Sequence, residues 1–306
     1  MGKRGWTLSS VLIVLTVLAM ACGSVAEPTS TPPTPSSATG EPDAAQAVNT
    51  PVPDVTATLA PIETGIRFPD PDMELIIRVA LKQMEGAIME AVLATLTGLD
   101  ASSNGVIAAH NTLIGPSTFD DLAVTDLSGL EYLTNLTMFS LDGYDQIRDL
   151  SPLPNLTRLT SLTIQANHVI DLSHLSNLTN LTRFDISRSG INDLSFLANL
   201  TKLTELRLTG NQIVDLSPLA NLTNLTVLWL GESQIVDISA PSNMTSLATL
   251  RLEFNQIHDL SPLVENEGLG EGDSIKLSYN DLDLEEGSEN MEHIRVLESR
   301  GVQVEY

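Results

Sequence analysis

One position of the sequence recurs with a fixed period and limits the possible folds more than any other feature. Aspartate occupies it every 22 residues, at Asp149, Asp171, Asp193, Asp215, Asp237 and Asp259. Five of these copies are followed by Leu-Ser, and the fifth in order by Ile-Ser. A period of about 20–50 residues is typical of solenoids, in which each repeat packs only against its neighbours. The chain therefore predicts a stack of similar units.

A strand-like segment precedes each aspartate. Residues 203–211 and 247–255 both follow the pattern L-x-x-L-x-L-x-x-N, which is that of a leucine-rich repeat. Because side chains alternate across a strand, Leu206 and Leu208 should face a core while Arg207 faces solvent. We expect strands in register, centred on Phe139, Leu162, Phe184, Leu206, Leu228, Leu250 and Ile275.

Two polar signals follow each strand. A small polar residue stands where the chain turns, and an Asn there can both donate to and accept from buried backbone groups; the set is Asp145, Asn167, Ser189, Asn211, Ser233, Asn255 and Asn280. The dipeptide Ser217-Pro218 then predicts a helix start with Ser as the N-cap and Pro as the first helical residue. Ser151-Pro152 and Ser261-Pro262 repeat it.

The ends of a solenoid need caps that cover its core. At the N-terminal end, residues 66–126 predict a helix begun by Asp70-Pro71 and reaching about Met84, a second helix over 88–96, and an irregular first repeat. The leucine-rich repeats occupy 127–284, with the insert 265–273 as an exposed loop. Residues 285–306 predict a C-terminal cap: a helix capped by Ser288 and ending near Ser299, then a closing strand.

Several motifs resemble the internalin-like leucine-rich-repeat proteins of bacteria. They are Phe68–Pro71, Leu96–Asp100, Asp126–Glu131 and the repeated Leu-Thr-Asn-Leu-Thr, within residues 66–306. The resemblance implies an extracytoplasmic recognition role and a curved, right-handed solenoid. The predicted fold is an α/β-type repeat solenoid: a leucine-rich-repeat horseshoe with a parallel β-sheet on its concave face, a helical N-terminal cap and a helix-strand C-terminal cap. Residues 104–124 depart from the pattern and leave the register of the first strand open.

The N-terminus predicts export. Lys3 and Arg4 precede an apolar run that is too short to span a bilayer stably. Residues 18–22, Leu-Ala-Met-Ala-Cys, resemble the lipobox of bacterial lipoproteins, which implies a signal peptide over 1–21 and lipidation of Cys22. The other interpretation is an ordinary secretory signal that ends at an incidental cysteine. Residues 22–65 are rich in Pro, Thr and Ser and predict a disordered tether, so we expect a protein of the cell envelope, lipid-anchored to the membrane.

Charge and residue chemistry narrow the classes of function. The formal charge is −24, which disfavours nucleic acid, because such binding relies on Lys and Arg. Cys22 is the only cysteine and no two histidines have metal-ligand spacing. No phosphate-binding loop or nucleophile elbow occurs. We therefore expect a monomer that is not an enzyme and uses no cofactor or metal.

The outward positions of the strands provide the binding candidates. The central column is Ser140, Thr163, Asp185, Arg207, Trp229, Arg251 and Lys276. Aromatic and Arg side chains are enriched at binding hot spots, so the predicted ligand surface is Arg183, Asp185, Arg207, Trp229, Arg251, Phe254, Lys276 and Tyr279. Self-contact is the alternative, with Trp229 held between Arg207 and Arg251 as a cation–π sandwich.

Three functions remain open for this surface. The first is binding of a protein or peptide partner on the concave face. The second is binding of carbohydrate or cell wall through exposed aromatics such as Trp229, Phe254 and Tyr279. The third is a passive structural role in the envelope. Ion-paired protein binding should weaken with salt, whereas stacking on sugar should change little.

Overall fold

The computed structural model describes residues 65–102, 105–108, 112–114, 122–142, 146–166, 169 and 171–306. The predicted signal peptide, Cys22 and the tether up to residue 64 lie outside these ranges, as do the turn residues Asp145 and Asn167. Among the described residues, no helix has the length and apolar character needed to cross a membrane.

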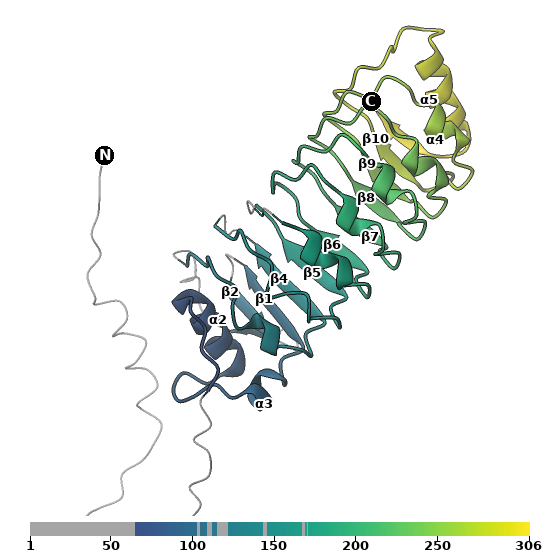
Figure 1. The fold of residues 1–306 in the computed structure, drawn as a ribbon. Coiled ribbons are helices and arrows are strands. Elements are labelled where there is room, and N and C mark those ends of the chain that lie inside the picture. Colours follow the sequence, from purple (N-terminus) through teal and green to yellow (C-terminus); the bar gives the residue numbers. More distant parts are fainter. Residues whose placement is uncertain are drawn as a thin grey trace, which may run out of the picture. The chain divides into compact units, whose positions relative to one another are not determined.

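The described residues form one repetitive unit around an eleven-stranded sheet (Figure 1). The parallel strands are β1 (Gly98–Ser102), β4 (Met138–Asp142), β5 (Ser161–Ile164), β6 (Arg183–Asp185), β7 (Glu205–Arg207), β8 (Val227–Trp229), β9 (Thr249–Arg251), β10 (Ser274–Lys276) and β11 (Gln303–Glu305). A hairpin of β2 (Gly105–Ala108) and β3 (Thr112–Ile114) extends the sheet beyond β1 with antiparallel pairing.

The strand register agrees with the sequence prediction. Leu206 pairs with Phe184 on one side and Leu228 on the other, and the row continues through every predicted strand centre. These side chains are buried. The first strand, whose register the sequence left open, joins the same row, because Leu99 pairs with Phe139.

Short helical turns face the sheet across the leucine core. They are η3 (Leu130–Tyr132), η4 (Ser173–Asn177), η5 (Ser195–Leu197), η6 (Ser217–Leu219), η7 (Ala240–Asn243) and α4 (Ser261–Glu265). Each repeat thus places apolar residues between a strand and a turn, and only the neighbouring repeats complete their burial.

The prediction that Ser caps these turns is wrong. In η6 the N-cap is Leu216, while Ser217 and Pro218 are the first two residues of the turn. Asp215 supplies the capping contact instead, because its Oδ1 accepts the Ser217 N–H at 2.8 Å. Ser151-Pro152 forms a turn without a helical element, and α4 begins after Leu260 in the same way as η6.

Asparagines at the strand-to-turn position join adjacent repeats, as the sequence indicates. The Asn211 Nδ2 donates to the Leu208 carbonyl of its own repeat at 2.7 Å and to the Ile186 carbonyl of the preceding repeat at 3.1 Å. Its Oδ1 accepts the N–H groups of Ser189 and Ile191, both at 3.1 Å. Ser233 does not reproduce this bonding, because its buried Oγ has no hydrogen-bond partner among the described residues.

Both predicted caps are present, with differences in extent. Helix α2 (Pro71–Leu81) is N-capped by Asp70 and ends before Met84, because Lys82 adopts a left-handed conformation. The predicted helix over 88–96 is shorter, since α3 covers only Glu90–Leu93. At the other end Ser288 caps α5 (Glu289–Ser299), and β11 closes the sheet.

The insert at 265–273, which the sequence predicts to be an exposed loop, packs partly against the core. Asn266 is buried and donates to the carbonyls of Pro241 and Met244 at 2.8 and 3.2 Å. Leu269 is also buried. The insert therefore covers the side of the last repeats and is not an exposed loop throughout.

Candidate functional site

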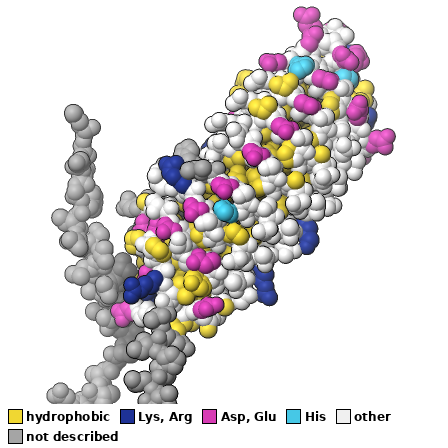
Figure 2. Space-filling view, in the orientation of Figure 1, with side chains coloured by type: hydrophobic (Ala, Val, Ile, Leu, Met, Phe, Trp, Pro, Cys, Tyr) yellow, Lys and Arg dark blue, Asp and Glu magenta, His cyan; other side chains and the backbone are white. Residues whose placement is uncertain are grey.

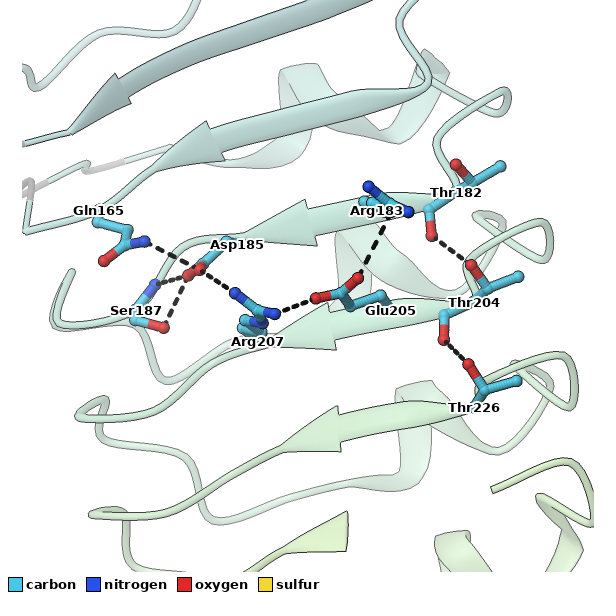
Figure 3. Close-up of polar contacts among 9 residues, drawn as sticks. All are labelled: Gln165, Thr182, Arg183, Asp185, Ser187, Thr204, Glu205, Arg207 and Thr226. Atoms are coloured by element: carbon cyan, nitrogen blue, oxygen red, sulfur yellow. Dashed lines mark hydrogen bonds and ion pairs between the residues drawn. The ribbon is translucent and has the colours of Figure 1, made fainter. Parts of the chain in front are cut away.

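The concave face, meaning the solvent-facing side of the parallel sheet, presents the predicted column of side chains in register. Arg207, Trp229 and Arg251 are cross-strand partners on β7, β8 and β9, and Lys276 follows on β10. Threonines at the strand entrances fix this alignment. For example, the Thr204 Oγ1 donates to the Thr182 carbonyl at 3.1 Å (Figure 3).

Trp229 is held between two guanidinium groups. The Cζ atoms of Arg207 and Arg251 each lie 4.2 Å from the centre of the Trp229 ring. The side chain is half-buried, and both faces of the ring are covered. The sandwich that the sequence offered as an alternative is therefore present, and Trp229 does not offer a free ring face for stacking.

Arg207 belongs to a network of ion pairs on β6 and β7. It contacts Glu205 and, at 3.9 Å, the Oδ2 of Asp185. Glu205 also lies 3.5 Å from the Nε of Arg183. Figure 3 shows these side chains reaching toward one another across adjacent strands. The predicted cations Arg183 and Arg207 are thus paired with the carboxylates of Glu205 and Asp185 in the free protein.

Asp185 lies at one end of this network and is buried. Its Oδ1 accepts the Ser187 hydroxyl at 2.7 Å, and its Oδ2 accepts the Gln165 Nε2 at 2.9 Å. Burial raises the pKa of Asp185 above its ordinary value, although the Ser187 hydrogen bonds and the charge of Arg207 oppose the rise.

Arg251 differs from its neighbours in the column. Lys276 forms an ion pair with Glu305 at 2.6 Å, and Arg207 has two carboxylates. Among the described residues, no ion pair or hydrogen bond involves the Arg251 side chain; its contact is with the Trp229 ring. Trp229 therefore positions a cation whose charge no carboxylate of the described chain neutralises.

Unsatisfied polar atoms gather around this stack. Seven buried side-chain polar atoms lack a hydrogen-bond partner among the described residues, and four of them are Arg207 Nε, Trp229 Nε1, Arg251 Nε and Glu253 Oε2. A buried polar group without a partner costs about 1–3 kcal/mol. Such a concentration in one place is unusual in a folded protein and marks this part of the concave face as a candidate site.

Sequence reasoning missed the role of Gly231 beside the stack. Neighbouring repeats have Thr209 and Glu253 at the equivalent position. A Cβ on Gly231 would lie 3.0 Å from Glu253 Cδ, so the absence of a side chain lets the Glu253 carboxylate lie over this strand. A glycine that interrupts a column of larger residues is the signal that could have indicated a close approach.

Phe254 and Tyr279 form a second feature at the ends of β9 and β10. Their rings are stacked, with centres 4.3 Å apart and planes 7° apart. Phe254 is 49% exposed and Tyr279 73% exposed. Both have positive φ, but Ala166, Arg188 and Glu232 share this conformation in other repeats. The backbone strain is thus a property of the repeat, whereas the exposed aromatic pair is particular to these two positions.

Charge elsewhere emphasises the cationic stack. On the face seen in Figure 2, acidic side chains are spread along the length of the unit, and Lys and Arg appear at few positions. In the part of the chain that the structure describes, no group of three or more His, Cys, Asp or Glu side chains is placed to hold a metal ion.

Comparisons with known proteins agree with this architecture. Three overlapping segments each match a family model that describes two copies of the leucine-rich repeat; they are residues 179–221, 201–241 and 223–265. Internalin C2 from Listeria monocytogenes is 31% identical, with a TM-score of 0.62, and the match covers 78% of this chain and 94% of that chain. No curated protein sequence matches significantly.

Two further solved structures are similar. A second Listeria monocytogenes internalin is 27% identical, with a TM-score of 0.45, over 78% of this chain and 91% of that chain. A leucine-rich-repeat protein from Leptospira interrogans is 21% identical, with a TM-score of 0.48, over 58% of this chain and 44% of that chain.

Proposed function

The chain belongs to the internalin-like leucine-rich-repeat proteins, and from this premise we propose that it binds a protein or peptide partner on its concave face. The observation that supports the proposal is the cluster of unsatisfied polar atoms at Arg207, Trp229, Arg251 and Glu253. These atoms are themselves buried, so a partner would contact the groups beside them, above all the Arg251 guanidinium, which has no ion pair among the described residues and can donate to a partner.

The proposed surface has two parts. The first is the Arg207–Trp229–Arg251 stack with Lys276 beside it and the Arg183–Asp185 network at its edge. The second is the stacked pair of Phe254 and Tyr279. Rigid aromatic and Arg side chains surrounded by polar residues are typical of interface hot spots. The proposed activity is therefore recognition and involves no catalysis.

Photo-crosslinking tests the location. A benzophenone amino acid replaces Tyr279 in one variant and Val214, an exposed residue outside the strands, in the other. Both variants are irradiated on the cells that make the protein. We expect a protein adduct from position 279 and none from position 214. Equal adducts from both positions, or none from position 279, would place the binding surface elsewhere.

Carbohydrate binding is the second candidate, and the open face of Tyr279 favours it. The ring stacks on Phe254 with one face and is largely exposed, which suits a sugar ring. Trp229 does not support this function, because guanidinium groups cover both of its faces. Binding of neutral oligosaccharides that is lost in Tyr279→Ala and insensitive to salt would favour this candidate over a protein partner.

We further propose that a lipid on Cys22 anchors the protein outside the cytoplasm, with residues 22–65 as the tether. The support is the lipobox-like sequence that ends at the single cysteine, and stable anchoring requires about two acyl chains. Cys22→Ala should release the protein from the detergent-extracted membrane fraction. Mass spectrometry that finds no lipid on the wild-type protein would contradict the anchor.

A further inference from the structure

We propose that Arg251 is the receptor for a carboxylate of a peptide or protein partner, and that the same partner segment places an aromatic side chain on Tyr279. The proposal rests on the proposed function, because it names the chemistry of a ligand for the concave face. It assigns different tasks to the two parts of that surface, and it makes Trp229 a positioning residue.

Charge selects Arg251 among the three cations of the column. Arg207 has two carboxylate neighbours and Lys276 has one. Arg251 has none among the described residues, although the chain carries a formal charge of −24. Its terminal amino groups make no hydrogen bond with the described residues either. A carboxylate can accept from both amino groups at once, and such bidentate pairs are among the stronger hydrogen-bonded contacts.

Glu253 does not neutralise Arg251, although it lies only two residues away on the same face. Its Oε2 is buried without a partner, and the side chain leans over Gly231. No ion pair joins it to Arg251. Glu253 keeps a negative charge two residues from Arg251 in the sequence, so a dense polyanion would meet more repulsion at this face than a single carboxylate does.

Trp229 prepares Arg251 for binding. The Arg251 Cζ lies 4.2 Å from the ring centre, and this contact restricts a side chain that is otherwise flexible. A side chain that is already ordered loses less conformational entropy when it binds. The Trp229 ring also contacts Arg207. The carboxylate neighbours of Arg207 hold that side chain in place.

Tyr279 lies at a fixed offset from this receptor. Lys276 on β10 is the cross-strand partner of Arg251, and Tyr279 follows three residues later. β10 ends at Lys276 and Tyr279 lies in a bend with positive φ, so the offset along the strand direction is at most about 10 Å, at about 3.3 Å per residue. An extended peptide spans that distance in about three residues. The partner segment should therefore carry its acidic and aromatic side chains about three residues apart.

The test uses the full chain with Trp6→Phe, so that Trp229 is the only tryptophan whether or not residues 1–21 are removed, and its emission reports on the stack. The probes are the capped peptides acetyl-Glu-Gly-Gly-Phe-amide and acetyl-Gln-Gly-Gly-Phe-amide. We expect the Glu peptide to change the emission with a dissociation constant about tenfold lower than that of the Gln peptide. The preference should vanish in Arg251→Gln and remain in Lys202→Gln, which removes an exposed cation outside the parallel strands.

Two more comparisons separate the parts of the proposal. Tyr279→Ala should weaken the binding of acetyl-Glu-Gly-Gly-Phe-amide and leave the binding of acetyl-Glu-Gly-Gly-Ala-amide unchanged. In a chain with Trp229→Phe, binding measured by calorimetry should keep part of the preference for Glu, and Trp229→Ala should lose it. Circular dichroism melting checks that each variant folds.

Several results would overturn the proposal. They are equal affinity for the Glu and Gln peptides, a preference that survives Arg251→Gln, no response to the Glu peptide at about 10 mM, and binding of glucuronate in place of the peptide. If any one of these results is obtained while crosslinking from position 279 still captures a protein, only the carboxylate assignment fails. Loss of that crosslink as well would reject the concave binding function.

Discussion

Two polar regions of the same repeats differ in whether their polar groups have hydrogen-bond partners. At the aspartate turns, each of the six Ser N–H groups donates to the preceding Asp at 2.8 Å. At the concave stack, Arg207, Trp229 and Arg251 each keep a buried nitrogen without a partner among the described residues. A contact within one repeat is copied with the repeat, whereas contacts between variable positions are not. The unsatisfied groups therefore collect where the sequence varies, which is where a partner can be specified.

The core beneath the sheet should show the largest effect of any single substitution. Leu206 is fully buried between Phe184 and Leu228. Leu206→Ala should lower the unfolding free energy by about 2–5 kcal/mol, from lost burial and the cavity that remains. Urea denaturation measures the change. Arg251→Ala, which removes an outward side chain of the same sheet, should cost well under that, and equal losses would contradict the division between faces.

The stack should matter more for binding than for stability. Trp229→Ala removes the ring that positions Arg251, so affinity for the crosslinked partner should fall by about 2 kcal/mol or more. The melting temperature should change little, because the ring lies outside the leucine core. Isothermal calorimetry and thermal melting measure the two quantities. Unchanged affinity would show that the unsatisfied atoms do not mark the binding surface.

The strand-to-turn position has a hydrogen-bonded side chain in one repeat and an unpartnered one in another. Asn255 donates to the Leu230 and Leu252 carbonyls, both at 3.0 Å. Asn255→Ala should cost about 1–3 kcal/mol, because these buried groups lose their partner. Ser233→Ala at the equivalent position should be neutral or stabilising, since its buried Oγ is already unpartnered among the described residues. A Ser233→Ala loss as large as that of Asn255→Ala would indicate a hydrogen bond at Ser233.

Acid titration should give the smallest effects, with opposite signs for two aspartates. The backbone and hydroxyl hydrogen bonds of Ser217 lower the pKa of Asp215, so its contribution is present above the unfolded pKa of about 3.9 and is lost as pH falls through the folded value. Burial raises the pKa of Asp185, so its contribution is present below the unfolded pKa and is lost as pH rises through the folded value.

The two Asn variants therefore separate these carboxylates. Relative to wild type, Asp215→Asn should lose unfolding free energy between pH 3 and pH 7, and Asp185→Asn should gain it over the same range. Denaturation at a series of pH values measures both. If the unfolding free energies of the two variants change in the same direction with pH, the pKa values of Asp215 and Asp185 are not shifted in opposite directions.

The sequence by itself determined the period, the inward row of apolar residues, the column of Arg207, Trp229, Arg251 and Lys276, and the positions of both caps. These follow from local periodicity, because a 22-residue repeat fixes which residues stand side by side once the strands pair. It misplaced the turn cap, because both Ser and Asp are favoured N-caps and Ser directly precedes Pro, whereas in the structure Asp215 accepts the Ser217 N–H two residues further on.

Only the tertiary structure decided how the side chains of the column share their partners. The sequence offered Trp229 as an exposed contact or as the centre of a sandwich, and the folded protein selects the sandwich. It also showed that Arg207 and Lys276 are neutralised while Arg251 is not, and that Asn266 in the insert is buried. The physical reason is that ion pairs and ring stacking depend on rotamers across three or more strands, which no periodicity along the chain encodes.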